Sequence, residues 1–285
     1  MPLRDAGMPG NDAGEEALIR GATVERVART ASTNDDLLAR VRAAAAAGAI
    51  EFAPCLLVAD VQTAGRGRSG RRWHSAPGRS LCFSLAWQPR RADLGGLSLA
   101  VGVAIADALD PRNGPEHGTG RIGIKWPNDL WLVDRAGSTV PHGSGRKLAG
   151  ILVETAPLGA GRVAVIGVGV NIAAHAADDA ASGVASLDEL DRTATAASTL
   201  ARIVPALKAA LARFDGQGFA AFAERFAARD VLRGRSVVAA NGEVAGVAAG
   251  IAADGALLVD IGGRIVAVTS GEWRLRIAAE TERSC

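Results

Sequence analysis

The clearest pattern of polar and apolar positions along the chain begins at Ser32. Asp35 and Asp36 follow this hydroxyl residue and precede the run LLARVRAAAAAG, which is rich in good helix formers. Serine commonly caps a helix N-terminus, acidic residues favour its first turn, and glycine commonly follows its last turn. The sequence therefore predicts a helix that begins after Ser32 and ends at Gly48.

Short apolar segments separated by turn residues predict strands further along the chain. Residues 94–110 lie among them and carry apolar residues at helical spacing. The last four predicted strands follow one another with only turns between, which favours an antiparallel meander within a mixed sheet. The predicted strands are 55–60, 80–87, 122–126, 130–134, 146–155 and 162–172.

The C-terminal third predicts helices followed by a small β structure. We expect helices at 196–213, with Pro205 as a kink or a restart, and at 217–228. From Val231 the chain has segments of about five residues separated by two-residue hairpin signals, which predict a small barrel or sandwich. The hairpin signals are Asn241-Gly242, Asp254-Gly255 and Gly262-Gly263.

Composition narrows the possible classes of protein. With 285 residues, 48% of them hydrophobic, the chain can bury a sizeable core, and its net charge of +2 means that any anion site is local. The three cysteines lack paired spacing, and the N-terminus does not read as a secretory leader, so we expect a reduced, cytoplasmic protein. Zinc-ligand spacing, a Walker motif and a GxSxG elbow are missing from the sequence.

One loop concentrates positive charge, although the chain as a whole is nearly neutral. Residues 63–73, TAGRGRSGRRW, contain four arginines and three glycines. Its glycines match the GxGxxG dinucleotide fingerprint, but Pro77 and Gly78 lead into another strand where that motif requires a helix. An RNA-binding segment and a solvated hairpin tip are further interpretations. Arginine suits bidentate contact with carboxylate or phosphate, and glycines let backbone amides approach the same oxygens. The composition of the loop therefore favours a site that binds a carboxylate and a phosphate.

Two lysines and an asparagine in apolar segments also suggest a local anion-binding site. Lys125 ends one predicted strand in KWPND, and Lys147 begins another in KLAGILVE. A buried lysine requires an anionic partner, although a lysine at a strand end can also extend to water. Asn171 follows an apolar strand, where it is either a turn former or a ligand-binding residue.

Five motifs in order along the chain resemble those of the biotin protein ligases, which attach biotin to carboxylase carrier domains. This resemblance implies an α+β fold in which helices flank a mixed sheet, related to class II aminoacyl-tRNA synthetases, with a C-terminal SH3-like barrel. Residues 1–15 are rich in Gly, Pro and Asp and lack an apolar period, which predicts a disordered tail. With the resemblance we expect a catalytic biotin- and ATP-binding domain at 16–229, the SH3-like domain at 230–278 and a tail at 279–285. The motifs are STN (32–34), QTAGRGRxGRxW (62–73), KWPND (125–129), KLAGILVE (147–154) and GVGVN (167–171), with weaker similarity through 270–276.

The resemblance implies a reaction in two steps. Biotin and ATP give biotinyl-5′-AMP and pyrophosphate, and a lysine of a biotin carboxyl carrier domain then attacks the acyl carbon. By resemblance, Arg66, Arg68 and Lys147 stabilise the charge that develops on the transferring group. Lys125 is expected to contact phosphate, and Asp129 to orient or deprotonate the acceptor amine. Mg²⁺ is expected with ATP, held by waters and phosphates without protein ligands.

Substrate-binding residues are also implied. Ser32, Thr33 and Gln62 are expected at the ureido group of biotin, beside the backbone of 150–153. Trp73 is expected to cover the ligand, and the loop to act as a lid that is poorly ordered until biotinyl-adenylate binds. Asn171 is expected near the adenine or ribose. Asn34, Gly65, Gly67, Asn128 and Gly150 complete the predicted binding set.

Two features of the chain depart from the pattern of this family. The polar, glycine-rich segment RAGSTVPHGSGR (135–146) is longer than the tight connection that the family implies. Only 31 residues precede Ser32, too few for the winged-helix domain of bifunctional ligase-repressors, so we expect no DNA binding. A lipoate or octanoate ligase on the same fold is the nearest alternative, and an RNA-binding module is the alternative from another class.

Overall fold

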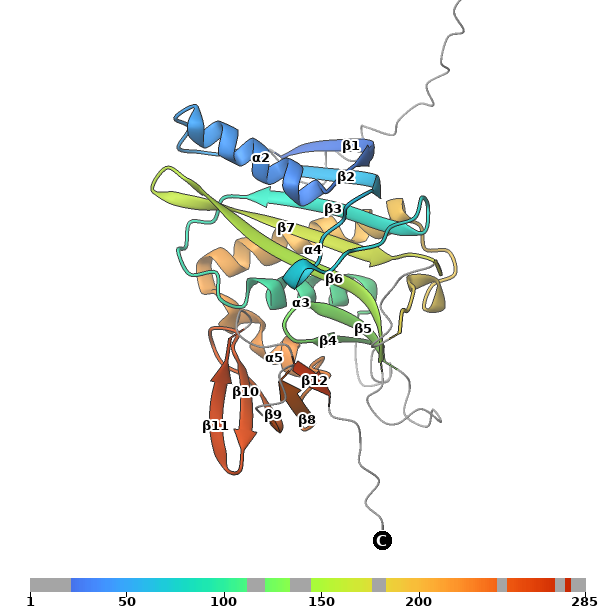
Figure 1. Cartoon of the computed structure of the whole chain (residues 1–285), viewed down its shortest axis with the longest axis vertical. Coiled ribbons are helices and arrows are strands. Elements are labelled where there is room, and N and C mark those ends of the chain that lie inside the picture. The colour runs from blue at the N-terminus through green and yellow to red at the C-terminus, as the bar shows by residue number, and fades with distance from the viewer. Residues whose placement is uncertain are drawn as a thin grey trace, which may run out of the picture.

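The computed structural model describes residues 22–111, 121–133, 145–175, 183–239, 245–269 and 275–277. Within these ranges a mixed seven-stranded sheet has one helix on one face and two long helices on the other (Figure 1). The strand order is β1-β2-β3-β7-β6-β5-β4, and β1 pairs with β2 in parallel whereas every other neighbouring pair is antiparallel. The strands are β1 (Thr23–Thr30), β2 (Cys55–Gln62), β3 (Ser80–Trp87), β4 (Ile122–Lys125), β5 (Asp129–Val133), β6 (Gly145–Leu158) and β7 (Gly161–Asn171).

The predicted meander is confirmed, and one strand was missed. Strands β4 to β7 follow one another as antiparallel neighbours, within a few residues of the predicted bounds. Strand β1, TVERVART, did not stand out in the sequence because its apolar positions are interrupted by charged residues. It lies at the edge of the sheet and is largely exposed, so there was little burial to create a pattern.

The predicted helix after Ser32 is confirmed as α2 (Thr33–Ala46). The Ser32 hydroxyl accepts a hydrogen bond from the Asp35 N–H at 3.3 Å, as an N-cap residue does. Leu37, Leu38 and Val41 are buried in a core cluster with apolar residues of β2, β3, β6 and β7. This packing covers only part of one face of the sheet, and it places the first turn of α2 beside the part that it leaves uncovered (Figure 1).

The opposite face carries the larger core. Helix α3 packs there against β4, β5 and β6, and helix α4 packs against β3 and α3. Helix α4 continues through Pro205 without interruption, so the expected restart at this proline is wrong. None of the described helices combines the length and apolar character that a bilayer-spanning helix requires. The helical elements on this side are α3 (Leu97–Leu109), η2 (Leu187–Glu189), α4 (Ala196–Gln217), η3 (Phe219–Phe222) and α5 (Ala223–Ala227).

The predicted small β structure is also confirmed. Its strands form a five-stranded antiparallel sheet in the order β11-β10-β9-β8-β12, which fits an SH3-like fold. Gly255, Gly262 and Gly263 have positive φ in the predicted hairpin turns. The predicted turn at 241–242, both predicted tails and most of the insertion at 135–146 lie outside the described residues. The strands are β8 (Ser236–Ala239), β9 (Ala245–Ile251), β10 (Leu257–Ile261), β11 (Arg264–Val268) and β12 (Leu275–Ile277).

A buried arginine fixes the segment that leads into the small sheet, and the small sheet shares a core with helices α3 and α4. The Arg229 side chain is buried and donates hydrogen bonds to Asp107 at 2.8 Å and to the Ile122 carbonyl at 2.9 Å. Apolar residues of β8 to β11 belong to the same core cluster as α3 and α4. Trp126 also donates a hydrogen bond to the Gly255 carbonyl at 2.9 Å. The small sheet is therefore held beside the β4–β5 turn.

Candidate functional site

Glycines leave open space above the part of the sheet that α2 does not cover. Gly167 and Gly169 alternate along β7 toward this face, and Gly150 on β6 pairs with Gly169. A Cβ atom at Gly167 would lie 2.2 Å from Asn34 Oδ1. The result is a cavity of about 650 Å³ above the sheet, beside the first turn of α2.

This single cavity brings together the residues that the sequence predicted. Every predicted catalytic and substrate-binding residue except Gly65 lines it. Gly65 instead belongs to the hairpin that closes over the cavity, where an added Cβ would lie 2.6 Å from the Trp73 carbonyl oxygen. The chemical roles of these residues stay predictions.

Trp73 lies flat against the glycines of the sheet. An added Cβ at Gly169 would lie 2.3 Å from Trp73 Cε2, and one at Gly150 would lie 3.3 Å from Trp73 Cζ3. The ring therefore occupies the space that side chains on β6 and β7 would otherwise fill. Cys82 on β3 lies in register with Gly169. Burial raises the pKa of the Cys82 thiol to about 11, although hydrogen bonds with Trp73, Gln62 and Ser75 lower it.

We expect Gly169→Ala to weaken biotin binding about 10- to 100-fold, because overpacking at this contact would displace Trp73 and the hairpin. Gly161→Ala in the same strand is the matched control, since an added Cβ there meets only the Leu158 carbonyl oxygen at 3.9 Å. Isothermal titration calorimetry with biotin measures the effect. Wild-type affinity in Gly169→Ala would show that the Trp73 position does not matter for the ligand.

A network of neutral polar groups lies at the α2 end of the cavity. Gln62 Oε1 accepts hydrogen bonds from Thr33 N at 2.8 Å and from Thr33 Oγ1 at 3.1 Å. Ser84 Oγ lies 2.6 Å from Thr33 Oγ1 and donates to Asn34 Oδ1 at 2.6 Å. Ser32, Thr33, Asn34 and Ser84 are all buried. These donors and acceptors, set among apolar walls, suit a compact ligand with its own amide-like groups.

Sequence reasoning missed Ser84, although a signal for it was present. The segment SLCFSLAW has Ser80, Cys82 and Ser84 at every second position, and such alternation in an apolar strand indicates a polar side of the strand. All three side chains are buried on the cavity side of β3, opposite Leu81, Phe83 and Leu85 in the main core. Asp35 and Glu154 were missed as well, because their importance depends on contacts with the arginine loop.

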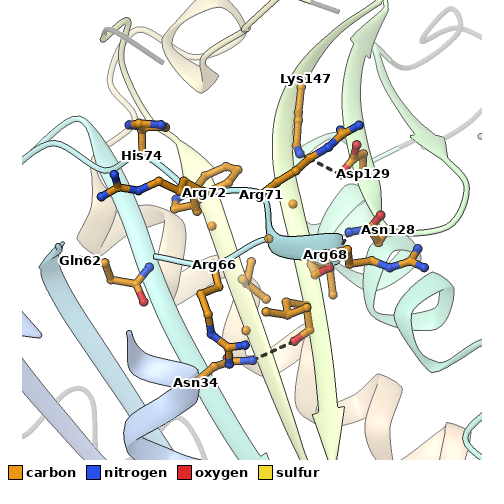
Figure 2. Close-up of a pocket in the computed structure, with 18 of the residues that line it drawn as sticks. Asn34, Gln62, Arg66, Arg68, Arg71, Arg72, His74, Asn128, Asp129 and Lys147 are labelled. Atoms are coloured by element: carbon orange, nitrogen blue, oxygen red, sulfur yellow. Dashed lines mark hydrogen bonds and ion pairs between the residues drawn. The ribbon is translucent and has the colours of Figure 1, made fainter. Parts of the chain in front are cut away.

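The arginine loop forms a short hairpin over the cavity. Gly67 N donates to the Arg71 carbonyl at 2.7 Å, and Trp73 N donates to the Gly65 carbonyl at 2.8 Å. The tip is the single 3₁₀ turn η1 (Arg68–Gly70), in which Ser69 has the left-handed φ of 57°. This hairpin, Gly65–Trp73, lies across the strands between Gln62 on one side and Asn128 and Asp129 on the other (Figure 2).

Arg66 is held by two carboxylates. Its Nε and Nη2 donate to Asp35 at 3.1 and 2.5 Å, and Nη2 also donates to Glu154 Oε2 at 2.7 Å. Burial disfavours the guanidinium charge, but the hydrogen bond and charge of Glu154, aided by Asp35, outweigh it and raise the pKa of Arg66. In this structure the Arg66 guanidinium is thus neutralised by two carboxylates, and its role toward an acyl-phosphate stays a prediction.

Arg68 and Lys147 place positive charge at the side of the cavity where Asp129 lies. Burial lowers the pKa of Arg68, and the carboxylate of Asp129 partly offsets this effect. Lys147 Nζ lies 3.1 Å from Asp129 Oδ1 and 5.7 Å from the centre of the Trp73 ring. Both members of the Lys147–Asp129 pair are less than one-fifth exposed. The pair places a cation and a carboxylate at the same point of the cavity wall (Figure 2).

The β4–β5 turn and the end of β7 complete the cavity wall. Asn128 donates to the Ile151 carbonyl at 2.8 Å, which ties the turn to β6. Lys125 Nζ lies 4.5 Å from the centre of the Trp131 ring. Asn171 donates to the carbonyls of Lys147 and Ala185 at 3.3 and 3.1 Å, so its amide holds neighbouring backbone segments together while it lines the cavity.

The charges around the cavity are strongly biased. Among its lining residues six are arginine or lysine and one, Asp129, is acidic. Preorganised cations of this kind attract phosphate groups and stabilise negative charge that develops during a reaction. The geometry thus combines a neutral polar compartment beside α2 with a cationic compartment under the hairpin.

Comparisons with known proteins agree with this arrangement. Residues 48–171 match the Biotin/lipoate A/B protein ligase family, and residues 234–273 match the Biotin protein ligase C terminal domain. The biotin protein ligase from Aquifex aeolicus in complex with biotin and ATP has a similar fold, with a TM-score of 0.69, 24% identity and coverage of 90% of this chain and 99% of that chain. The fold and the cavity thus define a protein ligase domain of the biotin and lipoate type.

Two relatives narrow this class. The chain is 34% identical over 255 residues to the biotin--[acetyl-CoA-carboxylase] ligase of Mycobacterium tuberculosis, and the alignment covers 86% of each chain. It is 35% identical over 228 residues to the bifunctional ligase/repressor BirA of Salmonella typhimurium, covering 78% of this chain and 66% of the relative, so that it spans about two thirds of that relative's length. The chain belongs to the biotin protein ligase family.

Proposed function

We propose that this protein is a biotin--[biotin carboxyl carrier protein] ligase. The observation that carries the proposal is the two-part cavity, in which a neutral polar compartment adjoins a cationic one. In the first step a biotin carboxylate oxygen attacks the α-phosphorus of ATP, and the bond to pyrophosphate breaks. In the second step a carrier lysine amine attacks the acyl carbon, AMP leaves, and the amine loses a proton as the amide forms.

In this proposal each compartment has one task. Ser32, Thr33 and Gln62 bind the ureido end of biotin, since they line the cavity and offer donors and acceptors. The buried Ser84 holds Thr33 in place from behind. Arg68 and Lys147 offset the repulsion between the biotin carboxylate and the α-phosphate. The adenosine part of the nucleotide extends toward Asn171, and Lys125 contacts the departing pyrophosphate.

We propose that Mg²⁺ enters with ATP. Asp129 is the sole carboxylate among the described lining residues, and it lies 3.1 Å from Lys147 Nζ. No group of three His, Cys, Asp or Glu side chains suited to a metal occurs in the described part of the chain. Mg²⁺ commonly keeps waters and phosphate oxygens as ligands, so the triphosphate supplies its coordination in this proposal and the ion neutralises phosphate charge.

The proposed acceptor is a lysine of the biotin carboxyl carrier domain of acetyl-CoA carboxylase or a related carboxylase. The name of the Mycobacterium tuberculosis relative supports this choice. The proposed location is the cytoplasm, where Cys55 and Cys82, both buried and unpaired in the described structure, stay reduced.

Biotin-dependent exchange of labelled pyrophosphate into ATP tests the proposal. We expect exchange with biotin and at least 10²-fold less with lipoate, because a site built to hydrogen-bond polar groups rejects a ligand that lacks them. The C-terminal match favours biotin over lipoate. Exchange with lipoate alone would contradict the substrate. Salt-sensitive RNA binding that persists under saturating biotinyl-5′-AMP would favour the RNA-binding alternative.

A further inference from the structure

We propose that Asp35, Arg66 and Glu154 form a clasp that holds the arginine hairpin closed over bound biotinyl-5′-AMP. In this inference Asp35 and Glu154 are positioning residues. Arg66 acts through its ion pairs with these two carboxylates, and its side chain is not a ligand of phosphate. The part of the inference that concerns the adenylate rests on the proposed function. The part that concerns the hairpin stands on the described geometry alone.

The clasp joins three elements that are distant in sequence. Asp35 lies in the first turn of α2, Glu154 lies on β6, and Arg66 begins the hairpin. The Asp35 carboxylate accepts from Nε and Nη2 of Arg66, and Glu154 accepts from the same Nη2. A bidentate arginine–carboxylate pair fixes orientation as well as distance. Arg66 therefore fastens the start of the hairpin to both sides of the cavity mouth.

The clasp is connected to the neutral polar network beneath it. Asn34 Nδ2 donates to Glu154 Oε2 at 2.9 Å, the oxygen that also accepts from Arg66. Asn34 Oδ1 accepts from Ser84 Oγ, which lies 2.6 Å from Thr33 Oγ1. A continuous chain of hydrogen bonds thus runs from the proposed ureido compartment to the hairpin. A ligand that orders Thr33 and Asn34 also favours the closed clasp.

The backbone at Arg66 is directed out of the hairpin. Arg66 and Arg72 form an antiparallel bridge, and the hydrogen bonds on either side of it are made by Gly67 N and Trp73 N. In such a non-hydrogen-bonded pair the N–H and C=O of both residues face away from the ladder. The side chain of Arg66 thus pairs with the two carboxylates, while its backbone N–H and C=O face away from the hairpin ladder.

The clasp is also able to open. The exposed fractions of the Arg66, Asp35 and Glu154 side chains are 39%, 50% and 26%. Partly exposed ion pairs are weak and are screened by salt, so the closed hairpin is in equilibrium with an open one. Ligands enter and leave through the open form. The strength of the clasp therefore sets the residence time of the adenylate.

Limited trypsin digestion of the ligand-free protein tests the clasp, because the hairpin carries four arginines. We expect the double variant Asp35→Asn/Glu154→Gln to be cleaved within residues 66–72 about tenfold faster than the wild type, since cleavage follows the population of the open form. Mass spectrometry locates the cut. Arg66→Lys is expected to give an intermediate rate, because lysine keeps the charge but loses the bidentate fork.

Asp36→Asn is the matched control. Asp36 is the neighbouring acid in the first turn of α2, and it accepts from Thr30 Oγ1 at 2.6 Å without contacting the hairpin. This variant loses the same charge at the same helix terminus, so it is expected to be cleaved at the wild-type rate. Equal cleavage rates for the wild type and the double variant would overturn the clasp, and so would equal acceleration by Asp36→Asn.

A second measurement connects the clasp to the ligand. Dissociation of preformed biotinyl-5′-AMP is expected to be about tenfold faster in the double variant and unchanged in Asp36→Asn. An unchanged dissociation rate in the double variant would overturn the effect on the adenylate. If the wild type did not bind biotinyl-5′-AMP, the proposed function would be wrong, and the hairpin clasp would still be decided by the cleavage rates.

Discussion

Lys147→Ala is expected to slow the formation of biotinyl-5′-AMP about 10²- to 10³-fold. This is the typical effect of removing one preorganised group that stabilises the negative charge developing in a reaction. Lys147 is positioned for this task by its place on β6, by Asp129 at 3.1 Å and by the Trp73 ring at 5.7 Å. The Lys147 side chain is only 17% exposed, so water cannot readily take over the role of its ammonium group in the variant. Its loss would also leave the Asp129 carboxylate near the cavity without this neighbouring cation.

Pyrophosphate exchange at saturating biotin and ATP measures this first step. Lys208→Ala is the matched control, because Lys208 is an exposed residue of α4 on the opposite side of the sheet. We expect the control to retain wild-type exchange and Lys147→Arg to recover part of the rate lost in Lys147→Ala. Near-normal exchange in Lys147→Ala would remove the proposed role of this lysine.

Asp129→Asn is expected to slow transfer from preformed biotinyl-5′-AMP to the carrier lysine by about 10²-fold or more, while adenylate formation changes much less. The acceptor amine is mostly protonated at pH 7, because the pKa of lysine is about 10.4, and an attacking amine must be neutral. In the ligand-free site Asp129 is paired with Lys147. In the proposed mechanism the phosphate of the adenylate attracts Lys147, and the freed carboxylate orients and deprotonates the incoming amine.

Separating the two half-reactions tests this assignment. The enzyme is loaded with biotinyl-5′-AMP, freed of ATP and mixed with carrier protein, and biotinylation is followed over time. Asp60→Asn serves as the control, because Asp60 is an exposed acid on β2 that does not line the cavity. Equal loss in both half-reactions for Asp129→Asn would contradict a role specific to transfer.

Local sequence signals predicted most of the elements. Helix α2 was predicted because its cap residues and helix formers lie side by side in sequence, and Ser32 does cap it. The β4–β7 meander was predicted because each strand is apolar and each connection is a turn. Strand β1 was missed because an edge strand without buried residues lacks an apolar pattern. The helix does not restart at Pro205, because α4 is stabilised along its length by packing on α3 and β3.

The sequence by itself determined the chemical inventory of the site, since an arginine- and glycine-rich loop, two lysines in apolar strands and a polar turn are local patterns. Tertiary structure alone decided how these groups are used. Glycines 150 and 169 provide the surface on which Trp73 lies, and Ser84 joins Thr33 to Asn34. The Arg66 side chain is paired with Asp35 and Glu154. Such a pairing depends on the distances in space between α2, β6 and the hairpin, and a local sequence pattern carries no information on these distances.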